Sequence, residues 1–370
     1  MRHIPRLLIL LLLLPAVTHG QNWLSPRYTL SLTGGRILAN MPRLDYTAVP
    51  FFGVDGAVAW PTSGAQPWHA AWRYPSMGFR FNYTRIPDGI AGDRFAVTAF
   101  VLNPVVRWGG NDRCSLSWVI GGGLSCYTNP YSRSHDPLNE SIGSYINCML
   151  EFGPVVAMDF PDGSSVGFSA KINHSSNGQL VPPNQGLNYV VGELGYSFPS
   201  RGQDARVAVA PSRDTATSYL YLSYAPGFVR PRYSGAEHRF YYCYTAQAGY
   251  MRRTGVRCAV GGNLDVMYNF SFKELVEWHH SKGEAYQYPY PFNIGLAATA
   301  EPYWGPLSMR FSVGGYLMRV NPPSNPTLPV YERVGAFYHF GHSRRHFAGV
   351  AMKIHLARID YIEWHYGICL

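Results

Sequence analysis

Apolar and polar side chains alternate along most of this chain in segments of about ten residues, as in β-strands whose two faces meet different surroundings. Between Met77 and Thr84, for example, apolar and aromatic residues occupy every odd position, and Gly, Arg, Asn and Thr occupy the even ones. Clusters of Asp, Gly, Pro and Asn separate the segments and indicate turns. In the first half the pattern predicts strands at Tyr28–Leu38, Val49–Trp60, Ala70–Ile86, Arg94–Trp108, Ser115–Tyr127, Ile142–Phe160, Ser164–Ser176 and Asn188–Phe198.

The second half shows the same alternation, interrupted once. Between Ser271 and Ser281, apolar residues spaced among charges predict one short helix in a surface loop. With the strands of the first half, those of the second make about 16 in all, a porin-like number. The second-half strands are predicted near Val207 and at Ser218–Phe228, Phe240–Tyr250, Val256–Phe270, Phe292–Ala300, Leu307–Arg319, Val334–Phe340 and Gly349–Leu370.

The composition favours a membrane location for these strands. Aromatic residues make up 15% of the chain and charged residues only 14%, as suits a barrel with aromatic girdles. No segment approaches about 18 consecutive apolar residues, which excludes transmembrane helices. We therefore predict an all-β, antiparallel transmembrane β-barrel of about 16 strands in one barrel, with two eight-stranded repeats as the alternative. A secreted β-sandwich or β-propeller is the alternative outside the membrane.

Residues 1–20 predict a secretory signal peptide, because two Arg precede the apolar run Leu7–Val17 and the small residue Gly20 follows at a cleavage offset. The run is too short to span a bilayer as a helix. We expect residues 21–200 to form the half of the barrel that carries the candidate site, and residues 201–370 to complete the barrel. The expected location is the outer membrane of a bacterial cell.

The net charge of +9 is carried almost entirely by Arg, since the lysines are only Lys171, Lys273, Lys282 and Lys353. Guanidinium groups suit phosphate, so an anionic lipid is a compatible partner, although solvated barrel rims explain the same excess. No basic helix or interleaved aromatic platform indicates nucleic acid. The six Cys match no metal-binding spacing. Cys114 and Cys126 could close a disulfide loop, whereas Cys243 and Cys258 fall on opposite faces of a predicted hairpin.

Candidate catalytic residues are concentrated between Val166 and Phe198. His174 and Ser176 continue the apolar face of the first strand there, at spacing i, i+2, and a His beside a Ser is the minimum needed to activate a hydroxyl nucleophile. Polar groups on an apolar membrane face are costly, which favours a functional role over a polar cross-strand pair. In the next strand Asn188 shares the apolar face and Glu193 does not, so we prefer Asn188 as the group that orients His174.

These residues and the intervening loop resemble the signature of the outer-membrane lipid A 3-O-deacylases, small β-barrel esterases whose active site opens sideways onto the lipid. The family's His and Ser match His174 and Ser176, its loop Asn matches Asn184, and its acidic third member matches Asn188. That last match is a departure, because an Asn can hold an imidazole tautomer but offers no negative charge. The resemblance covers about 35 residues closely and extends loosely back to about Tyr28.

The resemblance implies hydrolysis of the 3-O-linked acyl ester of lipid A in lipopolysaccharide, without a metal or an organic cofactor. The Asn184 amide, with backbone N–H groups from Asn177–Gly178 or Gln185–Gly186, would stabilise the oxyanion. One alternative is a non-catalytic porin or structural barrel. Another is an outer-membrane acyl esterase or acyltransferase acting on phospholipid.

Three weaker candidates lie in the second half. Adjacent histidines in a helix point in different directions, so His279 and His280 are not expected to share a metal. A cationic turn could hold a lipid phosphate, although a polar barrel turn is the default interpretation. That turn contains His339, His342, Arg344, Arg345 and His346. Lys353-Ile354-His355 resembles the segment ending at His174, but His355 falls on the polar face with no Ser at i+2, so a second active site is not expected.

Overall fold

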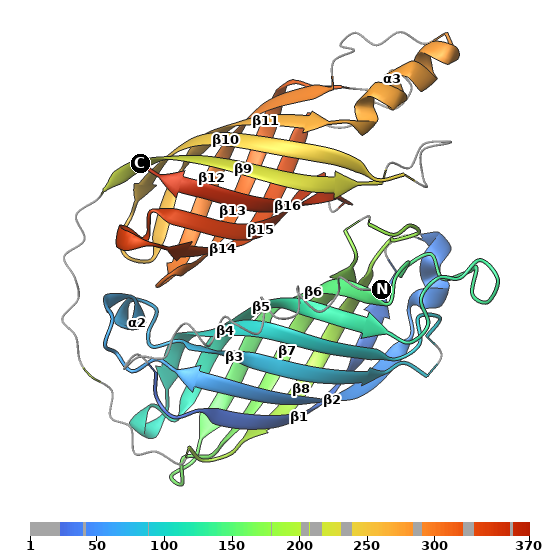
Figure 1. Ribbon diagram of the computed structural model, residues 1–370. Coiled ribbons are helices and arrows are strands. Elements are labelled where there is room, and N and C mark those ends of the chain that lie inside the picture. The colour runs from blue at the N-terminus through green and yellow to red at the C-terminus, as the bar shows by residue number, and fades with distance from the viewer. Residues whose placement is uncertain are drawn as a thin grey trace. The chain divides into compact units, whose positions relative to one another are not determined.

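The computed structural model describes residues 23–39, 42–87, 89–178, 180–200, 207, 217–230, 239–283, 291–320, 329–355 and 358–370. These residues form two closed antiparallel barrels, β1–β8 and β9–β16 (Figure 1). The signal peptide expected at residues 1–20 lies outside the described residues. We call β1–β8 the first barrel and β9–β16 the second barrel.

The first barrel closes on itself. Its last strand pairs antiparallel with its first, with Leu194 opposite Leu32 and Tyr196 opposite Leu30. The prediction of one ring of about 16 strands is therefore wrong, and the alternative of two eight-stranded units fits. The strands are β1 (Arg27–Leu38), β2 (Pro50–Pro61), β3 (Ser76–Arg85), β4 (Arg94–Trp108), β5 (Cys114–Tyr127), β6 (Ile146–Asp159), β7 (Ser165–Ser176) and β8 (Leu187–Ser197).

The second barrel closes in the same way, with Ile368 of its last strand opposite Leu222 of its first. The second half of the chain therefore does not complete the barrel of the first half. Its strands are β9 (Ser218–Val229), β10 (Tyr241–Arg253), β11 (Cys258–Asn269), β12 (Phe292–Trp304), β13 (Leu307–Met318), β14 (Val330–Phe340), β15 (His346–His355) and β16 (Arg358–Cys369).

The described strands number 16, as expected, but two errors in the prediction compensate. Val207, where a strand was expected, is not in one, and its neighbours lie outside the described residues. The single strand expected at Gly349–Leu370 is instead the hairpin of β15 and β16. No Gly or Pro lies between His355 and Arg358, so the sequence did not signal the break between the two strands.

Among the described residues, two short helices lie outside the strands of the barrels. The helix expected at Ser271–Ser281 is confirmed as α3, with the same bounds. The helix α2 (Pro67–Ala71) was missed, and the strand predicted from Ala70 begins only at Ser76. Pro67 at the first turn fixes a helical φ there, which alternation cannot indicate. Single 3-10 turns occur at Pro42–Thr47, Gly110–Asp112 and His342–Arg344.

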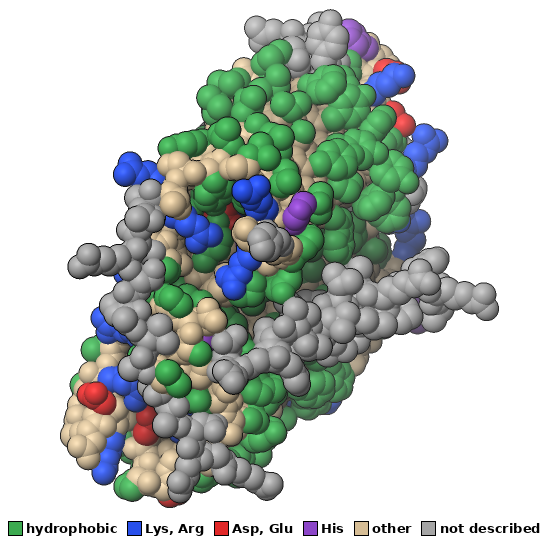
Figure 2. Space-filling model, turned by 60° about the vertical axis from the view of Figure 1, so that its left-hand side comes forward, with side chains coloured by type: hydrophobic (Ala, Val, Ile, Leu, Met, Phe, Trp, Pro, Cys, Tyr) green, Lys and Arg blue, Asp and Glu red, His purple; other side chains and the backbone are tan. Residues whose placement is uncertain are grey.

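Each barrel has an apolar outer face and a polar interior. In β8, Val190 and Leu194 point outward and are exposed, whereas Glu193 points inward and is buried. Hydrophobic side chains cover much of the outer surface in Figure 2. On the second barrel, aromatic rings of β10, of β11 and of the residue directly after β11 form a contiguous outward patch where the strands meet the longer loops. Its rings belong to Tyr242, Tyr244, Tyr268 and Phe270. Such a patch is typical of the girdle at a membrane interface.

Among the described residues, no helix is long and apolar enough to cross a bilayer. All six Cys are free thiols. Cys114 and Cys126 are the first residue of β5 and the last but one, so the strand itself holds them apart by roughly 40 Å at about 3.3 Å per residue. The disulfide considered between them does not form.

Candidate active site on the outer face of the first barrel

Strand β7 presents two different faces. Phe168 and Ile172 point outward, with 56% and 58% of their surface exposed, while Lys171 and Ser175 point inward and are buried. His174 continues the outward series, two positions after Ile172. Ser176, two positions further, has 6% of its surface exposed. The face assignment made from the sequence is confirmed, and the candidate residues lie outside the lumen.

His174 and Asn188 are direct cross-strand partners at the end of β7 and the start of β8. The imidazole Nδ1 lies 2.6 Å from the Asn188 amide oxygen. Because that oxygen can only accept, Nδ1 carries the donated proton and Nε2 of the neutral ring presents a lone pair. An imidazole held in this tautomer can act as a general base toward a hydroxyl on its Nε2 side.

Ser176 is contacted by the amide of Asn184, from the loop between β7 and β8. Asn184 Nδ2 donates to Ser176 Oγ at 2.7 Å. The orientation of the amide is fixed by its oxygen, which accepts from the backbone N–H of Asn177 at 3.2 Å. A buried side-chain donor is therefore aimed at the hydroxyl, where the oxygen of a tetrahedral intermediate could be stabilised.

Gly186 packs directly against the imidazole. It adopts φ +72°, and a Cβ there would lie 2.9 Å from His174 Cε1, so a side chain would displace the ring. Its N–H donates to Ser141 O at 2.9 Å, and that of Gln185 donates to Glu140 O at 3.1 Å. These two N–H groups, one of the two alternatives expected to stabilise an oxyanion, therefore donate to backbone carbonyls of the neighbouring segment. Gly178, also expected to contribute, has φ +64° in the same loop.

The segment between β5 and β6 supports this loop and was not singled out from the sequence. Ser144 Oγ accepts from Asn177 Nδ2 at 3.0 Å. Within the segment, buried Asn139 donates to Asn129 O at 2.7 Å and accepts from the N–H of Ile142 at 3.1 Å. The contact between Ser144 and Asn177 joins two loops that are 33 residues apart in sequence, so spacing along the chain could not reveal it.

Glu193 lies in the lumen of the first barrel, on the opposite side of the sheet from His174. Its carboxylate binds the ammonium of Lys171 and accepts from Ser31 Oγ at 3.0 Å. Arg80 and Glu151 complete the cluster with an ion pair of 2.6 Å. Glu193 is thus part of a buried charge network and does not orient the imidazole, in agreement with the face argument.

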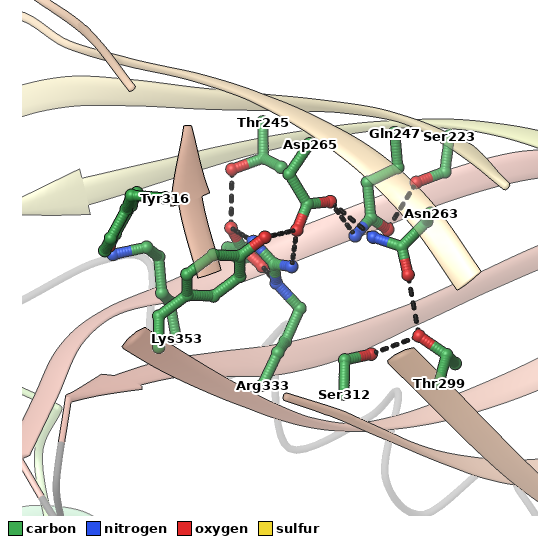
Figure 3. Close-up of polar contacts among 12 residues, drawn as sticks. Ser223, Thr245, Gln247, Asn263, Asp265, Thr299, Ser312, Tyr316, Arg333 and Lys353 are labelled. Atoms are coloured by element: carbon green, nitrogen blue, oxygen red, sulfur yellow. Dashed lines mark hydrogen bonds and ion pairs between the residues drawn. The ribbon is translucent and has the colours of Figure 1, made fainter. Parts of the chain in front are cut away.

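The second barrel also holds a polar network in its interior, shown in Figure 3. Arg333 lies between Glu363 at 2.6 Å and Asp265 at 2.8 Å, and Tyr331 OH also binds Asp265 at 2.5 Å. Further hydrogen bonds extend the network through the side chains of Thr245, Gln247, Asn263, Thr299 and Ser312. These groups satisfy one another, which is what burial of polar atoms requires.

The weaker candidates are dispersed. His279 is buried in α3 and His280 is exposed. At the cationic turn, His339 points into the lumen with Glu301, while His346 contacts Tyr366 OH at 3.0 Å. The side chain of His342 lies outside the described residues. In the described part of the chain, no group of His, Cys, Asp or Glu is arranged to hold a metal ion.

Two family models match the chain. Residues 53–197 match the model described as lipid A 3-O-deacylase (PagL), and residues 216–369 match the model described as acyloxyacyl hydrolase, C-terminal domain. The first match contains His174, Ser176, Asn184 and Asn188, and the second spans β9–β16 from just before β9.

Solved structures give weaker likenesses. The crystal structure of the outer membrane enzyme PagL is 17% identical, with a TM-score of 0.32, and covers 46% of this chain and 99% of its own. A triple-mutant porin of Rhodopseudomonas blastica is 9% identical, with a TM-score of 0.18, and covers 94% of this chain and 99% of its own. Among curated proteins, none matches the sequence.

Proposed function

Because the chain belongs to the lipid A 3-O-deacylase (PagL) family, we propose that its first barrel hydrolyses the 3-O-linked acyl ester of lipid A, with Ser176 as nucleophile. One observation carries the assignment of residues. The pairs His174–Asn188 and Ser176–Asn184 are both hydrogen-bonded at one end of the outer face of β7 and β8, which a lipid substrate can reach from the membrane.

The mechanism follows from these contacts. His174 Nε2 takes the proton of Ser176 as Oγ attacks the acyl carbonyl carbon, and Asn188 keeps the imidazole in the required tautomer. The Asn184 amide donates to the oxyanion. Collapse breaks the ester bond, and the departing sugar hydroxyl takes the proton from His174. Water then attacks the acyl-serine, with His174 again accepting and returning the proton, and the fatty acid is released.

The interior of the first barrel argues against the porin alternative. Charged side chains from five strands, β2, β3, β6, β7 and β8, meet in the lumen and are nearly inaccessible to solvent. Lys171 is 3% exposed and Glu151 is 2% exposed. A water-filled channel would leave such groups hydrated. The ion pairs therefore favour a closed scaffold whose chemistry lies on the outside.

The proposed location is the outer membrane, which the protein reaches by export with a signal peptide. An outer-membrane β-barrel must cross the inner membrane first, and residues 1–20 have the pattern of a cleaved signal peptide. We assign the active site to residues 21–200 and a second, separately closed barrel to residues 201–370. The substrate partner is lipopolysaccharide in the surrounding leaflet.

The test is incubation of the purified, folded protein with lipid A, followed by mass spectrometry of the lipid and of the released fatty acid. Wild type should release one hydroxy fatty acid and leave lipid A shortened at the 3-O position, whereas Ser176→Ala and His174→Ala should not. Ser175→Ala is the matched control, because Ser175 points inward and accepts from Ser125 Oγ at 3.2 Å. Release from phospholipid alone, or no release at all, would contradict the proposed substrate or the proposed activity.

A further inference from the structure

The second barrel contains a hydroxyl, an imidazole and a carboxylate bonded in series. Tyr316 OH lies 2.7 Å from His355 Nε2, and His355 Nδ1 lies 2.6 Å from the Asp360 carboxylate. This is the order of contacts in a nucleophile–His–acid triad, with a phenol in place of the usual serine. The family match of the second barrel assigns none of these residues a role.

The series occupies the strand ends that correspond to the candidate site of the first barrel. His174 lies near the end of β7, the seventh strand of its barrel, and pairs with Asn188 near the start of β8. His355 is the last residue of β15, the seventh strand of the second barrel, and pairs with Arg358 at the start of β16. His174 follows the buried Lys171 by three positions, whereas His355 follows the buried Lys353 by two. Because side chains alternate between faces, that difference turns His355 toward the lumen instead of the lipid.

A lysine lies next to the phenol. Lys353 Nζ binds the Asp360 carboxylate at 2.5 Å and lies 5.5 Å from the centre of the Tyr316 ring. Figure 3 shows Tyr316 and Lys353 side by side at one edge of the polar network. A fixed ammonium at this position would stabilise the phenolate that forms when Tyr316 gives its proton to His355.

Solvent reaches this series but not the other histidine–carboxylate pairs described inside the barrel. The side chains of His355 and Asp360 are 23% and 30% exposed. In contrast, the side chains of His339 and Glu301 are 5% and 0% exposed, and those of His365 and Glu363 are both 0% exposed. The series of Tyr316, His355 and Asp360 is therefore partly exposed at the ends of the strands, while the other two pairs are buried in the interior.

We propose that Tyr316, His355 and Asp360 form a second hydrolytic centre, which cleaves small, water-soluble acyl esters. His355 Nε2 removes the phenol proton as the Tyr316 oxygen attacks the ester carbonyl. The alcohol leaves with that proton, and the acyl group remains on Tyr316. Water attacks the acyl-tyrosine with His355 as base, which releases the carboxylic acid and restores the phenol. This activity is independent of the lipid-facing site.

The experiment uses the full-length protein carrying Ser176→Ala, so that the lipid-facing nucleophile is absent, with p-nitrophenyl acetate as probe. We expect hydrolysis above the buffer rate, a loss of about 100-fold or more in the enzymatic rate on adding Tyr316→Phe or Asp360→Asn, and partial recovery of His355→Gly by free imidazole. Acid quenching should trap an acetyl group on the peptide containing Tyr316.

Tyr331→Phe is the matched control, because it removes another phenol bonded to a carboxylate deeper in the same lumen. Heat-modifiable migration on gels checks that each variant is folded. A buffer-level rate for the Ser176→Ala protein would overturn the proposal, as would full activity of folded Tyr316→Phe. An equal loss in Tyr331→Phe would also overturn it, since the effect would then come from the packing of the lumen.

Discussion

Asn184 donates its side-chain amide to Ser176 Oγ at 2.7 Å while its own oxygen accepts from the backbone of Asn177 at 3.2 Å. The loop thus fixes which end of the amide meets the hydroxyl. Two backbone donors that could have shared the role, at Gln185 and Gly186, are engaged with the segment between β5 and β6. The described contacts therefore leave Asn184 as the best-placed donor for an oxyanion on an acyl group bound to Ser176.

The first prediction concerns this amide. Asn184→Ala should lower kcat on lipid A by about 100- to 1,000-fold, because it removes a donor that acts on the transition state, with little change in KM. Steady-state release of fatty acid checks it. Asn173→Ala is the control, since Asn173 is a buried amide of β7 on the lumen face. Equal losses in the two variants would show that the effect is structural.

A second prediction tests Asn188, where the chain departs from the family. Asn188→Glu or Asn188→Asp should keep or raise activity, because a carboxylate stabilises the imidazolium that forms during attack. Asn188→Leu should lower kcat about 100-fold or more. Glu193→Gln, on the lumen face, should matter little for chemistry. If Glu193→Gln abolished activity and Asn188→Leu left it unchanged, the assignment of Asn188 to the outer face and Glu193 to the lumen face would be wrong.

Gly186→Ala is the third prediction. The new methyl would stand 2.9 Å from His174 Cε1, at a φ of +72° that alanine adopts poorly, so the imidazole must turn away from Asn188. We expect a loss of activity of about 10- to 100-fold with the barrel intact. Gly192→Ala in β8 is the control, because its added methyl meets only Gly34 O at 3.7 Å. Similar kinetics for the two variants would contradict the role given to Gly186.

The fourth prediction concerns the ion cluster in the first barrel. Lys171→Met leaves Glu151, Glu193 and Asp55 without the ammonium they share, at 3.3 Å from Glu151 and 3.9 Å from Asp55. Uncompensated buried charge should lower the free energy of unfolding by about 3–5 kcal/mol, measured by urea titration in micelles. Adding Glu193→Gln should restore part of the loss. Lys273→Met on the exposed face of α3 should have almost no effect.

The fifth prediction follows from the pairing of β1 with β8. A chain ending at residue 200 contains every strand of the first barrel, so it should fold into a heat-modifiable barrel and retain activity on lipid A. Gel migration and mass spectrometry of the product check it. A truncated chain that stays unfolded, while the full chain folds, would mean that the second barrel is required for closure.

Strand positions and faces were predictable, because alternation records which side of the sheet each residue faces. It placed Ile172 and Asn188 outward and Glu193 inward, as the structure has them. Ring closure was not predictable in this way. Whether β8 pairs with β1 or with a later strand depends on contacts between the first and last strands of the barrel. One of these joins Thr29 Oγ1 to Ser197 Oγ at 2.7 Å.

The candidate site was likewise predictable only in part. His174, Ser176 and Asn184 lie within one short stretch, so their spacing carried the information. The supporting residues Ser141 and Ser144 belong to another loop, and nothing in their local sequence distinguishes them from other polar loop residues. Tyr316 and His355 come from strands that are not consecutive, so spacing along the chain could not reveal their contact.

The outward position of His174 and Ser176 changes how the enzyme meets its substrate. Lipid A would arrive by lateral diffusion within one leaflet, without passing through the lumen or leaving the membrane. Turnover would then depend on the surface density of the lipid rather than on its bulk concentration. The released fatty acid and the shortened lipid would both remain in the same leaflet, where they compete with fresh substrate for the outer wall of the barrel.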